Sequence, residues 1–144
     1  MSKADDLYAI VSAAHALTRI AAAQRQNDAP AAQWRALKVL EHEGPQRIGG
    51  LAAACRTTQP GMTRLVGQLA EEGLVTRTSD PDDSRATVVT ITDAGIRAFA
   101  DWKAELSATL EPLFADLGDD EWAALSQAAR ILTSRTTPLE APAR

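Results

Sequence analysis

Residues 57–95 contain the pattern that most constrains the fold of this chain. A segment with apolar residues at three- and four-residue steps ends at Gly73, and two segments rich in β-branched residues follow, separated by the polar run Ser79–Ser84. The first spacing is typical of one face of a helix, and the second arrangement is typical of a β-hairpin. The pattern therefore predicts a helix followed by a protruding two-stranded wing.

The helical segment, residues 58–72, has two different sides. At 100° per residue, one side carries four large apolar residues: Met62, Leu65, Val66 and Leu69. The other side carries short or polar residues: Pro60, Gly61, Thr63, Arg64, Gly67 and Gln68. Thr58 is placed to cap this helix through its hydroxyl, and Pro60 is tolerated in the first turn because its missing N–H would have no intrahelical partner there. We expect a helix that buries its apolar side and presents a thin polar side.

An alanine-rich segment, residues 49–55, precedes this helix and is also expected to be helical. Only Arg56–Thr58 separate the two segments, which leaves room for no more than a tight turn, so the pair is a predicted helix-turn-helix. After Gly73, we expect strands over residues 74–78 and 86–91, joined by a loop of turn-forming residues.

Amphipathic helices are expected on both sides of this unit. Apolar residues recur at helical steps over residues 5–25, 31–43, 92–114 and 118–134. The first of these helices is expected to break at Asn27–Pro30, and the second to stop at Gly44-Pro45. The third is expected to begin with Thr92 as its cap and to kink or end at Pro112. The last is expected to bury four residues: Trp122, Leu125, Ala129 and Leu132.

Composition argues against several classes of protein. No apolar run approaches the ~18–20 residues needed to span a bilayer, and the N-terminus lacks the order of a secretory signal. We therefore expect a cytoplasmic protein without a membrane partner. Cys55 is the only cysteine, which argues against a disulfide or a thiolate zinc site. There is no phosphate loop, nucleophile elbow or metal motif, so we expect no enzyme, no cofactor and no metal.

The net charge of −4 is not an argument against a nucleic-acid partner, because the acidic residues are unevenly distributed. Residues 47–97 contain six basic and six acidic side chains, whereas residues 98–144 contain four basic and eight acidic ones. The middle section can therefore present a basic face if its acidic side chains point elsewhere.

Residues 51–95 resemble the MarR family of bacterial winged-helix transcription regulators. Three segments in this order and spacing carry the resemblance: Gly73-Leu74-Val75, Asp80-Pro81-Asp82-Asp83-Ser84-Arg85 and Ile91-Thr92-Asp93-Ala94-Gly95. The resemblance implies a mainly α fold with a small β-wing, in which a winged helix-turn-helix lobe is flanked by N- and C-terminal dimerisation helices. Within a single domain over residues 1–144, the implied parts are the lobe 31–91 and the dimerisation helices 5–28 and 92–135. The tail 136–144, which contains Pro138 and Pro142, is expected to be disordered.

The resemblance also implies a homodimer that binds a pseudo-palindromic operator in double-stranded DNA as a ligand-relieved repressor. Arg64 would be the main base reader, through bidentate bonds to guanine. Arg85 would enter the minor groove, with Asp83 orienting its guanidinium by a charge-assisted hydrogen bond. The other implied contacts to DNA are Thr58, Pro60, Gly61, Thr63, Gln68, Arg77 and Ser84.

Some positions leave alternatives open. Arg56 stands where family members often have Gly, and a left-handed Arg costs roughly 1–2 kcal/mol, so either the turn differs or a phosphate contact compensates. Members of the family commonly respond to small phenolic or lipophilic compounds; the corresponding lining here is Tyr8, His15, Trp34, His42 and Trp102, although core packing explains the Trp residues equally well. A buried position is the simpler role for Cys55. The alternative functions are a redox-sensing regulator that uses Cys55 and a helical protein-interaction module without DNA binding.

Overall fold

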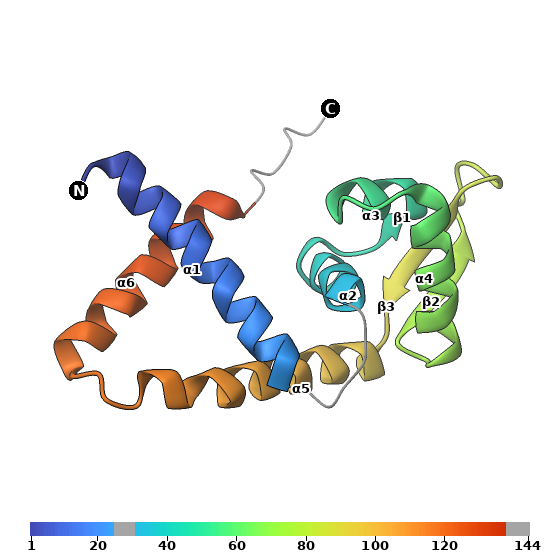
Figure 1. The fold of residues 1–144 in the computed structure, drawn as a ribbon. Helices are drawn as coiled ribbons and strands as arrows, with labels where there is room; N and C mark the ends of the chain where they lie inside the picture. Colours follow the sequence, from blue (N-terminus) through green and yellow to red (C-terminus); the bar gives the residue numbers. More distant parts are fainter. Residues whose placement is uncertain (25–30, 138–144) are drawn as a thin grey trace. The chain divides into compact units, whose positions relative to one another are not determined.

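A computed structural model describes residues 1–24 and 31–137 of the chain. This part holds α-helices and a three-stranded antiparallel sheet (Figure 1), and it divides into two compact units, Met1–Thr109 and Leu110–Arg144. The expected break at Asn27–Pro30 and residues 138–144 of the expected tail lie outside the described residues. Within the described ranges, no helix has the length and apolar character needed to cross a membrane.

Three helices form the body of the lobe in the first unit: α2 (Ala31–Glu43), α3 (Ile48–Ala54) and α4 (Gln59–Glu71). Each lies within one or two residues of the expected helix. Their apolar sides meet in a common core, where the most deeply buried side chains are Leu37, Leu40, Leu51, Met62, Val66 and Leu69. Gly44 follows α2 with φ +81°, the left-handed conformation that commonly ends a helix.

The turn between α3 and α4 contains a strained residue. Arg56 has φ +52°, while its N–H donates to the Ala53 carbonyl oxygen (3.2 Å) and the Thr57 N–H donates to that of Ala52 (2.9 Å). These two bonds make a Schellman motif, in which the left-handed position favours glycine. The predicted helix-turn-helix is confirmed, and the turn keeps its left-handed geometry although the residue is an arginine.

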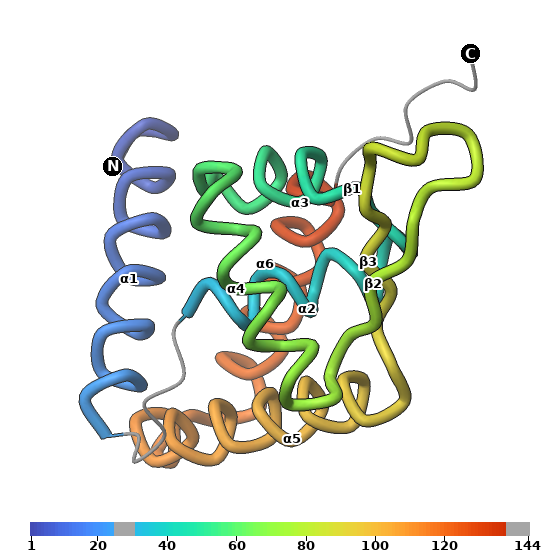
Figure 2. The backbone as a smooth tube through the Cα atoms, turned by 90° about the vertical axis from the view of Figure 1, so that its right-hand side faces the viewer, coloured from blue at the N-terminus to red at the C-terminus, as the bar shows by residue number. Residues whose placement is uncertain are grey.

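The sheet forms the wing. Its strands are β1 (Gln46–Arg47), β2 (Val75–Ser79) and β3 (Thr87–Ile91), in the spatial order β1-β3-β2 (Figures 1 and 2). Val75 and Val89 are buried and attach the sheet to the helical core. The predicted β-hairpin is confirmed, with residues 80–86 as the loop at its end.

A compact joint connects the end of α4, the start of β2 and the start of α5 (Asp93–Leu110). The Thr92 hydroxyl donates to the Gly73 carbonyl oxygen (2.7 Å) and accepts from the Gly95 N–H (3.0 Å). The Thr92 N–H donates to the Leu74 carbonyl oxygen (3.0 Å). A Cβ at Gly95 would overlap that same oxygen, so only glycine fits. The first and third of the three segments that carry the family resemblance are therefore the two sides of this joint.

The terminal helices α1 (Lys3–Gln24) and α6 (Asp119–Thr136) keep most of their apolar side chains exposed. Pro112 lies in the short 3₁₀ turn η1 (Glu111–Phe114) that follows α5, as expected. The expected burial on α6 is wrong for a single chain: Trp122 and Leu125 are 44% and 41% exposed, and Ala129 and Leu132 are exposed too. The physical reason is that the second unit is too small to cover the apolar side of α6 by itself.

Candidate nucleic-acid interface

The polar side of α4 is exposed and its first turn is capped as expected. The Gly61 N–H donates to Thr58 Oγ1 (3.1 Å), and Pro60 occupies the first turn. The Thr63 hydroxyl donates to the Gln59 carbonyl oxygen (2.9 Å), so that its lone pairs stay available as acceptors. Arg64 and Gln68 are also exposed. The arginine forms no ion pair with any residue that the structure describes, and its guanidinium is available to a ligand.

Two glycines make the exposed side of α4 thin, in different ways. At Gly61, a Cβ would lie 3.0 Å from Thr58 Oγ1, so the missing side chain keeps the helix cap intact. At Gly67, a Cβ would lie 3.9 Å from the Arg77 guanidinium, an ordinary contact. Arg77 on β2 therefore reaches the middle of α4, and the structure brings this predicted residue next to the exposed side of the helix.

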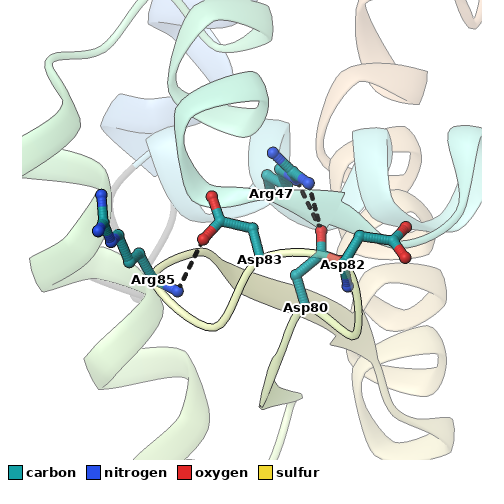
Figure 3. Close-up of polar contacts among 5 residues, drawn as sticks. All are labelled: Arg47, Asp80, Asp82, Asp83 and Arg85. Atoms are coloured by element: carbon teal, nitrogen blue, oxygen red, sulfur yellow. Dashed lines mark hydrogen bonds and ion pairs between the residues drawn. The ribbon is translucent and has the colours of Figure 1, made fainter.

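The wing loop differs from the prediction in how Asp83 contacts Arg85. Asp83 Oδ1 accepts a hydrogen bond from the Arg85 backbone N–H (3.0 Å), and the guanidinium points away from this carboxylate (Figure 3). The expected bond between the carboxylate and the guanidinium is therefore wrong. An aspartate two residues before a backbone N–H readily closes such a local turn. Asp83 thus shapes the backbone at Arg85, while Ser84 and the Arg85 side chain stay exposed.

The ion pair at the wing joins two residues that the sequence did not single out as partners. Arg47 Nε and Nη2 each lie 2.7 Å from Asp80 Oδ2 (Figure 3). The other carboxylate oxygen, Oδ1, accepts from the Asp82 backbone N–H (2.8 Å). The pKa of Asp80 lies below its ordinary value, chiefly because of this backbone hydrogen bond and also because of the Arg47 guanidinium. These residues are 33 positions apart, and no local sequence pattern pointed to a contact between them.

The residues expected to line an effector pocket are only partly brought together. Trp34 and Trp102 stack with their ring centroids 5.2 Å apart and their planes inclined by 14°. Tyr8 and His15 are exposed on α1, and His42 is exposed near the end of α2, with its Nδ1 2.9 Å from the Lys38 carbonyl oxygen. The stacked pair packs against the core, which is the role expected for these Trp residues without an effector.

Cys55 is buried at the end of α3 as part of the core of the lobe. Burial raises the pKa of its thiol, because desolvation disfavours the thiolate. A redox-sensing cysteine needs an accessible, low-pKa thiol. The geometry favours a structural role for Cys55 over the redox alternative.

Comparison with known proteins agrees with this geometry. Residues 28–86 match the family model described as MarR family. This part of the chain is therefore similar to the MarR family. The matched residues contain α2 to α4 and the loop of the wing, so the match includes every residue of the candidate interface.

The curated relatives of this chain are described as transcription regulators. A helix-turn-helix-type transcriptional regulator of Mycobacterium bovis is 38% identical over 85 residues, which cover 54% of this chain and 59% of the relative. The helix-turn-helix-type transcriptional repressor IacR of Pseudomonas putida is 31% identical over 65 residues, covering 45% of this chain and 39% of IacR. The relatives are described as regulators and not as enzymes.

Solved structures show that the similarity in fold extends over nearly the whole chain. The structure of a MarR family protein from Bacillus stearothermophilus has a TM-score of 0.74 at 20% identity and covers 96% of this chain and 99% of that one. The predicted fold class, mainly α with a small β-wing, is thereby confirmed.

Proposed function

We propose that this chain is a sequence-specific transcription regulator that binds double-stranded DNA. One observation carries the proposal. α4 buries its apolar side in the core and leaves Arg64 exposed, and the same lobe carries Arg85 exposed on the loop of a hairpin. A capped helix with a thin polar side fits a major groove, and an arginine on a wing fits a minor groove.

Arg64 carries most of the specificity in this proposal. A guanidinium can donate two hydrogen bonds to the N7 and O6 atoms of guanine, which gives ~1–3 kcal/mol of discrimination. The absence of side chains at Gly61 and Gly67 allows the backbone of α4 to come close to the bases. Hydroxyl and amide groups of the same helix contact phosphate or base edges, and these come from Thr58, Thr63 and Gln68.

Arg85 contributes affinity more than sequence choice. A narrow minor groove concentrates negative potential, and an inserted arginine is attracted to it with little dependence on individual bases. Arg77 and Ser84 lie on the same hairpin and supply contacts to the backbone phosphates. Such contacts position a protein on the duplex without reading its sequence.

The proposed assembly is a homodimer on a pseudo-palindromic operator. Exposed apolar side chains on the terminal helices support it, because a surface of this kind commonly binds another protein surface; they include Leu7, Val11, Trp122, Leu125 and Ile131. Two symmetry-related copies of α4 would then contact half-sites about one helical turn, ~34–36 Å, apart.

Repression that a small molecule relieves is the proposed output. The description of IacR as a repressor supports repression. A phenolic or lipophilic effector would bind one conformation of the dimer more tightly than another, the two differing in the distance between the lobes. Binding would then shift the population away from the conformation that binds DNA. The stacked Trp34 and Trp102 are the part of the expected pocket lining that lies together.

Selection of duplexes from a random-sequence library, followed by salt titrations, tests the proposal. Arg64→Ala should bind the selected duplex no better than a scrambled one. Arg85→Ala should weaken binding to both duplexes and lower the slope of log K against log salt by about 1. Arg35→Ala, which removes an exposed charge on α2 outside the terminal helices and the proposed DNA contacts, is the matched control and should bind like the wild type.

Two results would contradict the proposal in different ways. If Arg64→Ala and Arg85→Ala bind like the wild type, the DNA-binding face is wrong. If no duplex is enriched and the wild type shows no salt-dependent binding, the function is not DNA binding, and a helical protein-interaction module becomes the better description.

A further inference from the structure

Arg47 and Asp80 connect the wing loop to the helix-turn-helix. Arg47 lies on β1 and is also the residue that caps α3, the first helix of the helix-turn-helix. Asp80 is the first residue of the wing loop, directly after β2. Because β3 lies between β1 and β2 in the sheet, the ion pair between Arg47 and Asp80 bridges the two outer strands at the end where the loop emerges.

Among the described residues, the rest of the loop is held only by hydrogen bonds within the loop itself. The Asp80 N–H donates to the Ala86 carbonyl oxygen (3.0 Å), the Ala86 N–H donates to that of Asp83 (3.0 Å), and the Asp83 side chain binds the Arg85 N–H. These bonds give the loop a defined shape but do not hold it against α3. Among the described residues, the Arg47–Asp80 contact is the ion pair that does so.

The two donors of Arg47 meet a single carboxylate oxygen at 2.7 Å, which is the geometry of a strong, charge-assisted contact. Asp80 is nearly enclosed, with 11% of its side chain exposed, whereas Arg47 is 54% exposed. The Asp80 carboxylate is thus the more enclosed partner of the pair, and the Arg47 side chain extends to it from β1.

We infer that Arg47 and Asp80 are a positioning pair that sets the place of Arg85 relative to α4. This inference rests on the proposed function, because a protein that reads two grooves at once needs a fixed distance between its helix and its wing. The pair contacts neither the bases nor the minor groove in this scheme. Its contribution to DNA binding acts through Arg85.

Two substitutions with the same charge change separate positioning from simple electrostatics. Asp80→Asn and Asp82→Asn each remove one negative charge from the same loop, and either change alone should draw the loop toward DNA. Only Asp80→Asn breaks the ion pair, because the Asp82 carboxylate has no bonding partner among the described residues. We expect Asp80→Asn to raise the Kd for the selected duplex roughly three- to fivefold, the range of a well-formed ion pair with one exposed partner. Asp82→Asn should leave the Kd unchanged or lower it.

A double-mutant cycle with Arg85→Ala provides the decisive measurement. If the pair acts by positioning Arg85, Asp80→Asn has no further effect on the Kd in the Arg85→Ala protein but keeps its full effect in the Arg64→Ala protein. Circular dichroism of each variant confirms that the fold is retained, and Arg47→Lys, which keeps the charge but loses the two-bond geometry, should show a smaller loss than Asp80→Asn.

Three outcomes would overturn the inference. The first is an equal loss from Asp80→Asn with and without Arg85, which would make the pair a general structural contact. The second is tighter binding by Asp80→Asn, which would mean that the released Arg47 contacts phosphate itself. The third is absence of any salt-dependent duplex binding by the wild type, which removes the proposed function first and this inference with it.

Discussion

The joint between α4, β2 and α5 makes a strong prediction at Gly95. Substituting alanine adds one methyl group at a buried position in the first turn of α5. This methyl would overlap the Leu74 carbonyl oxygen and would lie 2.7 Å from Ile91 Cγ1. The backbone on at least one side must therefore move, and this movement stretches the hydrogen bonds that Thr92 makes to Gly73 and Leu74.

The sign of the effect is decided by opposing terms. Overpacking of a filled site costs about 1–3 kcal/mol, and weakening one of these hydrogen bonds adds about 1 kcal/mol. Alanine is about 1 kcal/mol better than glycine inside a helix, which opposes these costs. The free energy of unfolding of Gly95→Ala should therefore fall by about 2 kcal/mol.

Gly67→Ala is the matched control, because it makes the same chemical change in a helix where the new Cβ meets only the Arg77 guanidinium at 3.9 Å. Its free energy of unfolding should rise by up to about 1 kcal/mol. Urea unfolding followed by circular dichroism, at one protein concentration for all variants, gives both values. A Gly95→Ala protein that unfolds at the same or a higher urea concentration than the wild type, with an unchanged slope, would refute the steric reasoning.

Three further predictions concern single residues of the lobe. Arg56→Gly removes the strain of a left-handed arginine at φ +52° and should raise the free energy of unfolding, measured in urea, by about 1 kcal/mol. Unchanged stability would mean that the turn stores no strain. If the guanidinium contacts phosphate, the same variant binds the selected duplex more weakly. Cys55, buried and with a raised thiol pKa, should react with a thiol reagent only as fast as the protein unfolds, whereas rapid labelling of the native protein would revive the redox alternative. For Asp80, the pKa is depressed, so the contacts of its carboxylate stabilise the wing fully at any pH above the ordinary aspartate pKa of about 3.9. They are lost as the pH falls through the lower pKa of the folded protein. An NMR titration of the Asp80 carboxyl carbon with a midpoint at or above about 3.9 would contradict this.

Local signals determined most of the lobe in advance. The bounds of α2, the Thr58 cap and the end of α4 just before Gly73 each depend on residues within about four positions of one another, so that spacing alone is informative. The hairpin is a similar case, because its turn-forming residues separate two β-branched segments. The exposed side of α4 followed from the 100° helical repeat.

Contacts between distant residues could be decided only by the tertiary structure. Asp80 and Arg47 meet because the sheet order places β1 and β2 on either side of β3. The two residues are 33 positions apart in the sequence, so no local pattern indicates that they pair. In the same loop, spacing correctly joined Asp83 to Arg85 but could not tell a backbone N–H from a guanidinium as the donor. The burial expected on α6 was wrong for a single chain. An apolar side on a helix indicates that it needs a partner surface, but it does not tell whether the same chain or another one supplies that surface. Sequence spacing thus determined the elements and their exposed sides, while the long-range packing of the strands decided which charges meet at the wing.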